Sequence, residues 1–197
     1  MTIPVSLIRP ATLQDARALA ELVNLAGAGL QLSLWTKLAK DGEDPWSVGT
    51  ARARREQASF SYRNATIIEL DRTVAACLVG YPLAEEPAAI DETNIPATFV
   101  PLQQLENLAP GTWHVNVLAS YPKWQKHGFG TALLNHAEKL AVIAGVKRGM
   151  SVIVADNNVP ARRLYERMGY RHVADRPMVK ESWDGPGSSW VLLAKEK

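Results

Sequence analysis

The hydrophobic residues of this chain recur with two different periods along the sequence. Strict alternation, or a short continuous apolar run, is typical of β-strands and marks the segments at residues 5–9, 65–70, 74–81, 113–119, 149–155, 171–174 and 189–194. Apolar residues three and four positions apart are typical of amphipathic helices and mark the segments at residues 13–26, 30–39, 46–62, 99–108, 129–144 and 159–168. The pattern therefore predicts a mixed protein of strands and helices.

Capping and turn residues set the limits of several of these segments. Thr12, followed three residues later by Asp15, predicts a capped helix start. The polar turn at residues 71–73 joins two strand segments, so residues 65–81 are predicted to form a β-hairpin. Residues 85–96 are acidic, contain prolines and are predicted to form a loop.

One junction joins a strand, a glycine-rich turn and a long helix. The strand at residues 113–119 leads through residues 125–130, QKHGFG, into the helix at residues 129–144. Such a turn points several backbone N–H groups the same way, and the helix dipole adds partial positive charge there. Glycine leaves room for a phosphate to approach the backbone. The junction therefore predicts a cradle for a pyrophosphate. The expected buried stripe of the helix is Leu133, Leu134, Ala137, Leu140 and Ala141.

Other glycine-rich phosphate motifs do not fit this turn. A dinucleotide-binding fingerprint requires a third glycine, and a P-loop requires G-x-x-x-x-G-K-[ST]; the turn has neither. A G-x-G pair alone is common in structural turns, so a turn without a ligand is an alternative interpretation. The position between strand and helix, and a matching block farther along the chain, favour the phosphate interpretation.

Two ordered blocks of the sequence resemble the GCN5-related N-acetyltransferases (GNAT family). The first, Gln125-x-x-Gly128-x-Gly130, is similar to the family's acetyl-CoA pyrophosphate motif, [QR]-x-x-G-x-[GA]. Residues 118–122, LASYP, stand where the family often has L-A-V-x-P at the end of a bulged strand. The second block, residues 158–170, is similar to N-x-x-A-x-x-[LF]-Y-x-x-x-G-[FY]. The order and separation of the two blocks also match the family.

The resemblance implies both a fold and an activity. The fold would be α/β (α+β): a single GNAT domain over residues 1–197, with a central, mixed, mostly antiparallel twisted sheet of about six or seven strands, flanked by helices and splayed at a bulged central strand. The activity would be acetyl-CoA-dependent N-acetyl transfer, by direct attack of a primary amine in a ternary complex. The acceptor would be a small amine or a peptide or protein amine. Dimers are frequent among such proteins, so a homodimer is one expectation by analogy.

The resemblance also assigns residues that bind acetyl-CoA. The backbones of Leu118 and Ser120 would hydrogen-bond the pantetheine arm like an added strand. Asn158 would cap its helix and touch the donor, and Tyr165 would contact the CoA sulfur. The residues of the turn and of the first helical turn would hold the pyrophosphate: Gln125, Lys126, His127, Gly128, Phe129, Gly130 and Thr131.

Proton transfer to and from the substrates points to two side chains. An alkylammonium has a pKa of about 10.4, so a base with a pKa near 7 would help to deprotonate it. His114 lies on the central strand, where several family members place a basic residue. The segment HVNVLA is similar to the arylalkylamine acetyltransferases, with Asn116 in place of a second histidine. A histidine packed in the core, with ordered water as the base, is the alternative.

The departing CoA thiolate needs a proton, which a phenol can supply. Tyr165 matches the family tyrosine with this role, and packing is its alternative role. The helix starting near Val159 is expected to bury Ala161, Leu164 and Met168, with Tyr165 beside them.

The sequence leaves the acceptor unidentified. Residues 40–64 exceed what the family's plan requires between its first two strands, so this helical insert is a candidate cover for the acceptor pocket; a plain surface helix is the alternative. Residues 176–178 are a further candidate border of the pocket. The acidic residues of the loop would attract a cationic amine, or would simply be solvated: Glu85, Glu86, Asp91 and Glu92.

The composition is that of an ordinary globular protein. The chain has 197 residues, of which 47% are hydrophobic and 21% charged, and its net charge of +2 gives no indication of a nucleic-acid partner. The single cysteine, Cys77, lies in an apolar strand and is expected to be buried, with no disulfide and no metal site. The sequence shows no signal peptide and no long apolar run, so we expect a soluble cytoplasmic protein without membrane contact.

Other functions of the same residues are alternatives. A non-catalytic acyl-CoA-binding regulatory module would use the same fold. A nucleotide-phosphate-binding protein would use the turn at Gly128 and Gly130 for ATP or NAD. A protein that acts only through interactions would leave this turn without a purpose.

Overall fold

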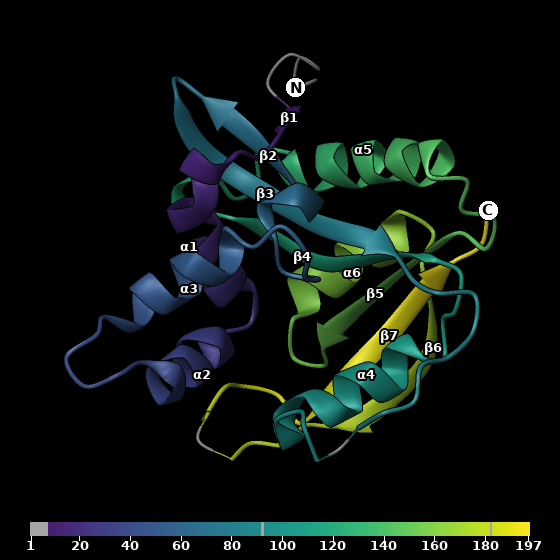
Figure 1. Ribbon diagram of the computed structural model, residues 1–197. Helices are drawn as coiled ribbons and strands as arrows, with labels where there is room; N and C mark the ends of the chain where they lie inside the picture. Colours follow the sequence, from purple (N-terminus) through teal and green to yellow (C-terminus); the bar gives the residue numbers. More distant parts are fainter. Residues whose placement is uncertain (1–7, 92, 182) are drawn as a thin grey trace. The chain divides into compact units, whose positions relative to one another are not determined.

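The computed structural model describes residues 8–91, 93–181 and 183–197 (Figure 1). Its strands are β1 (Ile8–Pro10), β2 (Ala65–Leu70), β3 (Thr73–Pro82), β4 (Trp113–Ser120), β5 (Met150–Ala155), β6 (Arg171–Pro177) and β7 (Ser189–Lys195). They form one seven-stranded sheet in the order β1-β2-β3-β4-β5-β7-β6. β4 and β5 are parallel, whereas the pairs β1–β2, β2–β3, β5–β7 and β6–β7 are antiparallel. The predicted fold class, a mixed and mostly antiparallel sheet with flanking helices, is confirmed.

The chain divides into two compact units. The first contains residues 8–80 and 116–136, and the second contains the described residues of 81–115 and 137–197. β4 and α5 (Phe129–Ile143) are each divided between the two units, after Val115 and after His136. Residues 5–7 of the first predicted strand, and Glu92, lie outside the described residues.

Helices α1 (Ala16–Ala26), α2 (Leu30–Leu38) and α3 (Pro45–Ala53) of the first unit pack on one another (Figure 1). The capped start predicted at Thr12 is confirmed, because the Thr12 N–H donates to Asp15 Oδ2 at 2.7 Å. Arg9 then joins this cap to the sheet: its guanidinium donates to both Asp15 and Glu69. The start of α1 is therefore fixed against β1 and β2.

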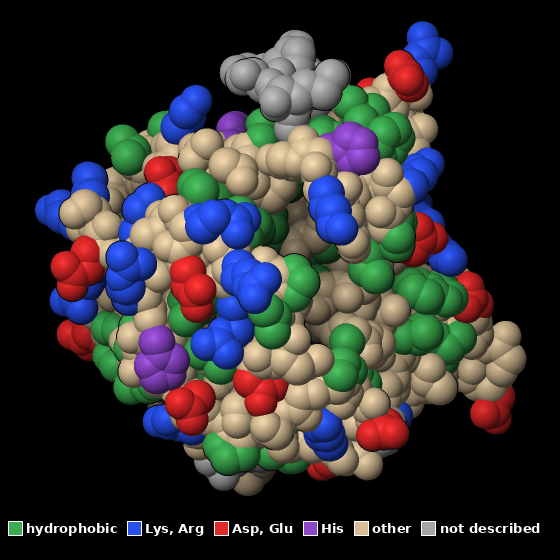
Figure 2. All heavy atoms as spheres, turned by 180° about the vertical axis from the view of Figure 1, so that it is seen from behind, with side chains coloured by type: hydrophobic (Ala, Val, Ile, Leu, Met, Phe, Trp, Pro, Cys, Tyr) green, Lys and Arg blue, Asp and Glu red, His purple; other side chains and the backbone are tan. Residues whose placement is uncertain are grey.

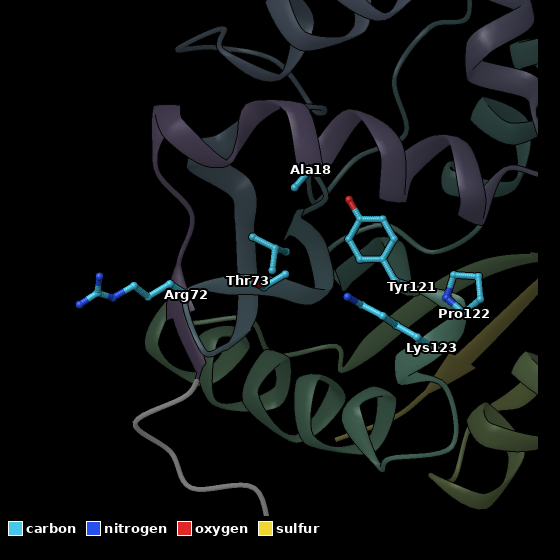
Figure 3. Close-up of a pocket in the computed structure, with 7 residues that line it drawn as sticks. Ala18, Arg72, Thr73, Tyr121, Pro122 and Lys123 are labelled. Atoms are coloured by element: carbon cyan, nitrogen blue, oxygen red, sulfur yellow. The ribbon is translucent and has the colours of Figure 1, made fainter.

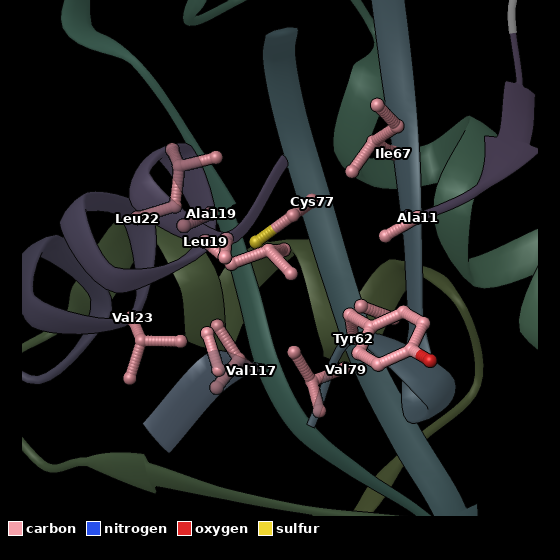
Figure 4. Close-up of a cluster of buried hydrophobic side chains, with 13 residues drawn as sticks. Ala11, Leu19, Leu22, Val23, Tyr62, Ile67, Cys77, Val79, Val117 and Ala119 are labelled. Atoms are coloured by element: carbon pink, nitrogen blue, oxygen red, sulfur yellow. The ribbon is translucent and has the colours of Figure 1, made fainter. Parts of the chain in front are cut away.

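A hydrophobic cluster forms the core of the first unit (Figure 4). Leu19 and Leu22 of α1 are fully buried, as are Ile67 of β2 and Cys77 of β3. Val117, from the second half of β4, belongs to the same cluster. Cys77 is buried as predicted, and burial raises the pKa of its thiol to about 12. The cysteine is therefore a packing residue and not a reactive thiol.

The helix predicted over residues 46–62 is too long. α3 ends at Ala53, and the chain then bends before the short 3₁₀ turn Tyr62–Asn64. Polar side chains donate hydrogen bonds to carbonyl oxygens that would accept backbone N–H groups in a longer helix. The Ser61 hydroxyl donates to the Arg55 carbonyl oxygen at 2.5 Å, and the Asn64 amide donates to the Ala58 carbonyl oxygen at 2.9 Å. Local side-chain bonds of this kind compete with helical hydrogen bonds.

The second unit contains α4 (Val100–Glu106), which packs on β6 and β7, and α6 (Val159–Arg167). The second half of α5 also belongs to this unit. Of the buried stripe predicted for α5, Leu133, Leu134, Ala137 and Ala141 are buried, and Leu140 is partly exposed. The stripe is thus confirmed apart from Leu140.

The surface carries charges of both signs. Figure 2 shows lysine and arginine side chains interspersed with aspartate and glutamate on one face of the molecule. Among the described residues, no helix is both long and apolar enough to cross a bilayer. The described part of the chain also holds no group of three histidine, cysteine or acidic side chains that is placed to bind a metal ion.

Candidate functional site

The glycine turn (residues 125–130) lies in the first unit, between β4 and α5. Gly128 has φ +81°, in the left-handed region that favours glycine, and a Cβ at this position would meet no atom within 4 Å. The N–H of Ala132 donates to the Gly128 carbonyl oxygen at 3.0 Å. The N–H groups of residues 128–131 precede it and have no partner within the helix. The turn is therefore an open helix start that can accept an anion.

Three aromatic rings pack against one another at the glycine turn. Phe129 is buried, and its ring lies 6.4 Å from that of Trp124 and 5.8 Å from that of His127. His127 Nδ1 also lies 2.8 Å from the Gln125 carbonyl oxygen, within the turn itself. Gln125, Lys126 and His127 are nevertheless exposed. The side chains thus fix the shape of the turn while its backbone stays accessible.

The second half of β4 leads into the glycine turn. Leu118 and Ser120 are partly exposed, whereas Val117 and Ala119 on the opposite face are buried. Tyr121 follows the strand, and its N–H donates to the Ala75 carbonyl oxygen of β3 at 3.0 Å. Leu118, Ser120 and the glycine turn therefore belong together in the first unit, and Thr131 follows them on the exposed side of α5.

Asn158 and Tyr165 lie in the second unit, on α6. The Asn158 side chain accepts a hydrogen bond from the Ala161 N–H at 3.3 Å, which confirms its role as helix cap. Tyr165 is 4% exposed, and its ring lies 5.6 Å from that of Tyr170. Burial raises the pKa of the Tyr165 phenol above its ordinary value. The phenol therefore keeps its proton at neutral pH.

The burial predicted for the other apolar residues of α6 is wrong in part. Ala161, Leu164 and Met168 are each only partly buried, and Tyr165 is the buried residue of the helix. A tyrosine has a larger apolar surface to remove from water than alanine. The side that faces the core is therefore centred on Tyr165.

His114 is also in the second unit and is 1% exposed. Its Nδ1 atom lies 3.0 Å from Ser151 Oγ, and its ring centroid lies 5.9 Å from that of Tyr81. Burial lowers the pKa of His114 to about 4, so the imidazole is neutral at neutral pH. An imidazole buried to this degree needs an intermediary to exchange a proton with a substrate.

Glu106 is a polar neighbour of His114 that sequence reasoning missed. Its Oε1 atom lies 3.7 Å from His114 Nε2, and its side chain is 27% exposed. Burial raises the pKa of this carboxyl group to about 7. Glu106 ends α4, and a turn separates it from β4, so no regular spacing in the sequence relates it to His114. Only the fold brings the two side chains together.

A pocket of about 580 Å³ lies within the first unit and is lined in part by residues 121–123, which precede the glycine turn in the sequence (Figure 3). Figure 3 shows the Lys123 ammonium group pointing toward Thr73, whereas the Arg72 guanidinium group points outward. The Tyr121 hydroxyl donates to Glu21 of α1 at 2.6 Å on the same side. The lining residues are Ala18, Arg72, Thr73, Val74, Tyr121, Pro122 and Lys123, none of them predicted from the sequence as a site residue.

Comparison with protein families gives one match. The sequence model of the acetyltransferase (GNAT) family matches residues 32–170, a range that includes every residue assigned above to the donor site or to proton transfer. A comparison with curated protein sequences finds no match.

Comparison with solved structures shows the same fold. One similar structure is the crystal structure of an acetyltransferase, with 22% identity and a TM-score of 0.70, covering 96% of this chain and 98% of that chain. Another is an N-acetyltransferase from Staphylococcus aureus Mu50, with 20% identity and a TM-score of 0.65, covering 94% and 98% of the two chains. A third is a GNAT family acetyltransferase from Elizabethkingia anophelis with acetyl-CoA bound, with 17% identity and a TM-score of 0.50, covering 68% and 75%.

Proposed function

The chain belongs to the acetyltransferase (GNAT) family, and we propose that it transfers an acetyl group from acetyl-CoA to a primary amine. Membership of the family makes it an acyltransferase; the donor, the acceptor and the residue roles are the proposal. The observation that carries it is the open glycine turn at the start of α5, inside the region that the family matches. That region also runs through both compact units, so we propose that the two units act as one catalytic domain.

The donor is supported by the chemistry of the turn. The pyrophosphate of acetyl-CoA is a doubly charged anion, and the N–H groups at the start of α5 suit such a group. The backbones of Leu118 and Ser120 hold the pantetheine arm in this proposal. The Elizabethkingia anophelis acetyltransferase, which shares the fold, has acetyl-CoA bound.

The reaction moves protons as well as the acetyl group. The acceptor ammonium loses one proton to a base, and the neutral amine attacks the thioester carbonyl carbon. As the C–S bond breaks, the thiolate gains a proton, and Tyr165, whose phenol is protonated at neutral pH, donates it in this proposal. A backbone N–H near Leu118 stabilises the oxyanion in between. His114 is part of the general base in this proposal. Because its side chain is buried, it exchanges a proton with the amine through another group.

The acceptor in this proposal is a small amine or a peptide amine. Both classes occur among proteins with this fold. One similar structure, with a TM-score of 0.57, is the ribosomal-protein-S18-alanine N-acetyltransferase from Escherichia coli. Another, with a TM-score of 0.58, is a putative phosphinothricin N-acetyltransferase. The insert at residues 40–64 stays a proposed border of the acceptor pocket.

Calorimetric titration with acetyl-CoA tests this function. We expect the protein to bind acetyl-CoA and CoA but not ATP or NAD. The variant Gly128→Glu should lose at least tenfold in affinity, because a carboxylate then occupies the place of the pyrophosphate.

Gly145→Glu is the matched control. Gly145 also has a positive φ, +74°, and open space around its Cβ position, but it lies beyond the other end of α5. Both variants therefore carry the same backbone strain, and only Gly128→Glu should lose binding. Equal affinity of the two variants for acetyl-CoA would refute the proposed role of the turn.

A further inference from the structure

Four polar side chains of the second unit form a row along β4, and three of them are buried. Thr112 Oγ1 lies 2.8 Å from Ser151 Oγ, and Ser151 Oγ lies 3.0 Å from His114 Nδ1. His114 Nε2 then faces Glu106 Oε1 at 3.7 Å. Thr112, His114 and Ser151 are each at most 5% exposed, and Glu106 is the member that reaches the surface. The row thus connects a buried imidazole to the outside through one carboxyl group.

The hydrogen bond that Thr112 donates determines which group is the donor in each of the other hydrogen bonds of this row. The Thr112 hydroxyl donates its only proton to the Ala109 carbonyl oxygen at 2.7 Å, and a carbonyl cannot donate in return. Ser151 must therefore donate to Thr112 Oγ1. Because the Ser151 proton is thereby used, Ser151 Oγ accepts from His114 Nδ1–H.

The tautomer of His114 determines whether its Nε2 atom presents a lone pair or a proton to Glu106. With its proton on Nδ1, a neutral imidazole presents the lone pair of Nε2 to Glu106. A charged carboxylate would face this lone pair with no proton between them, which is repulsive. A protonated carboxyl group can instead direct its O–H at Nε2, which lies 3.7 Å from Oε1. The row therefore favours the protonated form of Glu106, with the one proton of the pair on the carboxyl oxygen that faces Nε2.

We propose that Glu106 and His114 form a pair in which the Glu106 carboxylate takes the proton of the acceptor amine and then holds that one proton on the side of His114 Nε2, 3.7 Å from Oε1. His114 is then a positioning residue, which orients Glu106 and stabilises its protonated form. This inference rests on the proposed acetyl transfer for its catalytic part, and the proton arrangement stands without it.

The proton balance of the step is simple. The ammonium of the acceptor gives one proton to the Glu106 carboxylate, whose O–H then points at His114 Nε2. The neutral amine forms the C–N bond, the C–S bond breaks, and the second proton lost by the nitrogen balances the one gained by the thiolate. Glu106 releases its proton to water before the next turnover.

The surroundings of the pair suit a base that works near neutral pH. Burial raises the pKa of Glu106 to about 7, and Glu106 also ends α4, where the helix dipole disfavours negative charge. Tyr81 of β3 faces the other side of the imidazole, Ser151 of β5 faces Nδ1, and Thr112 lies behind Ser151. The partly exposed carboxyl group can exchange a proton with a ligand, whereas the imidazole cannot.

Nitrogen-15 NMR of the histidine side chains tests the proton arrangement without any substrate. We expect His114 at pH 7 to carry its proton on Nδ1, with a non-protonated Nε2. In Ser151→Ala, the imidazole loses its acceptor and can move the proton to Nε2, toward Glu106. His172 is the control, because it is exposed and also faces a carboxylate, Asp175. A proton on Nε2 of His114 in the wild-type protein would overturn the proposed pair.

The rate of acetyl transfer tests the catalytic part. The probes are phenethylamine, spermidine and a tripeptide with a free N-terminal alanine. We expect Glu106→Gln to lower kcat/KM by roughly 10²–10⁴-fold and to remove the acidic limb of its pH profile, with acetyl-CoA affinity unchanged. Ser151→Ala should move that limb to lower pH, because Nε2–H would favour the charged carboxylate. Glu196→Gln, which removes an exposed carboxylate, is the control.

The outcomes separate the two proposals. If the wild-type protein binds no acetyl-CoA and acetylates none of the probes, the proposed function fails, while the NMR result still decides the proton arrangement. If the protein is active and Glu106→Gln keeps the rate and the acidic limb, the catalytic assignment of Glu106 is wrong and the proposed function stands.

Discussion

At the scale of single residues, Tyr165 and Tyr170 give a controlled comparison. The two rings are 5.6 Å apart and both are buried, but only Tyr165 is proposed to give a proton to the thiolate. We expect Tyr165→Phe to lower kcat by roughly 10²-fold or more, within the range for a lost general acid, and to keep the affinity for acetyl-CoA. Phenylalanine keeps the ring contact, so the melting temperature should change little. Steady-state kinetics with the amine probes measures the effect.

Tyr170→Phe is the matched control for this prediction. The Tyr170 hydroxyl is buried without a hydrogen-bond partner among the described residues. Removing an unpaired buried hydroxyl is neutral or stabilising. The control variant should therefore keep its activity and melt at the same or a higher temperature. Equal losses of kcat in both variants would mean that Tyr165 acts only by packing.

The residues of the site differ in how far the sequence could predict them. The cap at Asn158 and the turn at Gly128 depend on local geometry, which a short motif encodes. The partnership of Glu106 with His114 depends on how the end of α4 meets β4, which no local pattern encodes. Burial of His114 likewise comes from packing, although its residue type had made it a candidate base. Candidate residues could be named from the sequence, but their electrostatic state could not.

At the scale of elements, the same contrast holds for strands and helices. The hairpin of β2 and β3 was predictable because its short polar turn carries Asp71 and Arg72, which both adopt positive φ. The start of α1 was predictable from the Thr12 cap. The end of α3 was not, because it depends on hydrogen bonds from Ser61 and Asn64, which return from later in the chain. Element starts with local caps are thus better specified than ends fixed by returning side chains.

Helix α3 of the insert lies very close to the preceding helix, α2, at one position. α3 passes α2 at Gly49, where a Cβ would lie 2.5 Å from the Trp35 ring. That ring cannot yield easily, because it is 3% exposed and stacks on Phe60 at 6.4 Å. Alanine would gain about 1 kcal/mol of helix propensity, but overpacking costs typically 1–3 kcal/mol. We therefore expect Gly49→Ala to lower the free energy of unfolding, by up to about 2 kcal/mol in urea titration.

Ser47→Ala is the control for this prediction. Ser47 is exposed on the same helix, so the substitution changes helix propensity without a new contact. It should leave stability unchanged or raise it slightly. A gain in stability for Gly49→Ala as well would show that α2 and α3 can separate without cost.

At the scale of the whole molecule, Glu106 and His114 contribute two opposing slopes to the pH dependence of stability. Burial raises the pKa of Glu106 from 4.5 to about 7, so the folded state is penalised increasingly as pH rises through that window. Burial lowers the pKa of His114 from 6.5 to about 4, so the folded state is penalised increasingly as pH falls through that window. Each shift corresponds to roughly 3 kcal/mol as an upper bound. The two penalties have opposite slopes and nearly cancel between about pH 4.5 and 6.5.

This cancellation has a simple meaning. Over that range, the folded pair holds one proton on the side of Glu106, and the unfolded chain holds one proton on histidine. Folding therefore moves a proton from one group to the other without net uptake or release, and the pair contributes almost no pH dependence. Substituting either Glu106 or His114 should reveal the pH dependence of the free energy of unfolding that the other residue contributes.

Urea titrations at a series of pH values test this prediction. The quantity compared is the difference in free energy of unfolding between each variant and the wild-type protein. Relative to the wild-type protein, Glu106→Gln should become more stable as pH rises from 4.5 to 7, because the wild type then carries the cost of a buried carboxylate. His114→Phe should show the opposite trend and become relatively more stable as pH falls from 6.5 to 4. The slopes, rather than the absolute values, carry the test, since each substitution also changes packing by a pH-independent amount. Parallel stability curves for the wild type and both variants would mean that neither group changes its pKa on folding, and that the row does not favour the protonated form of Glu106.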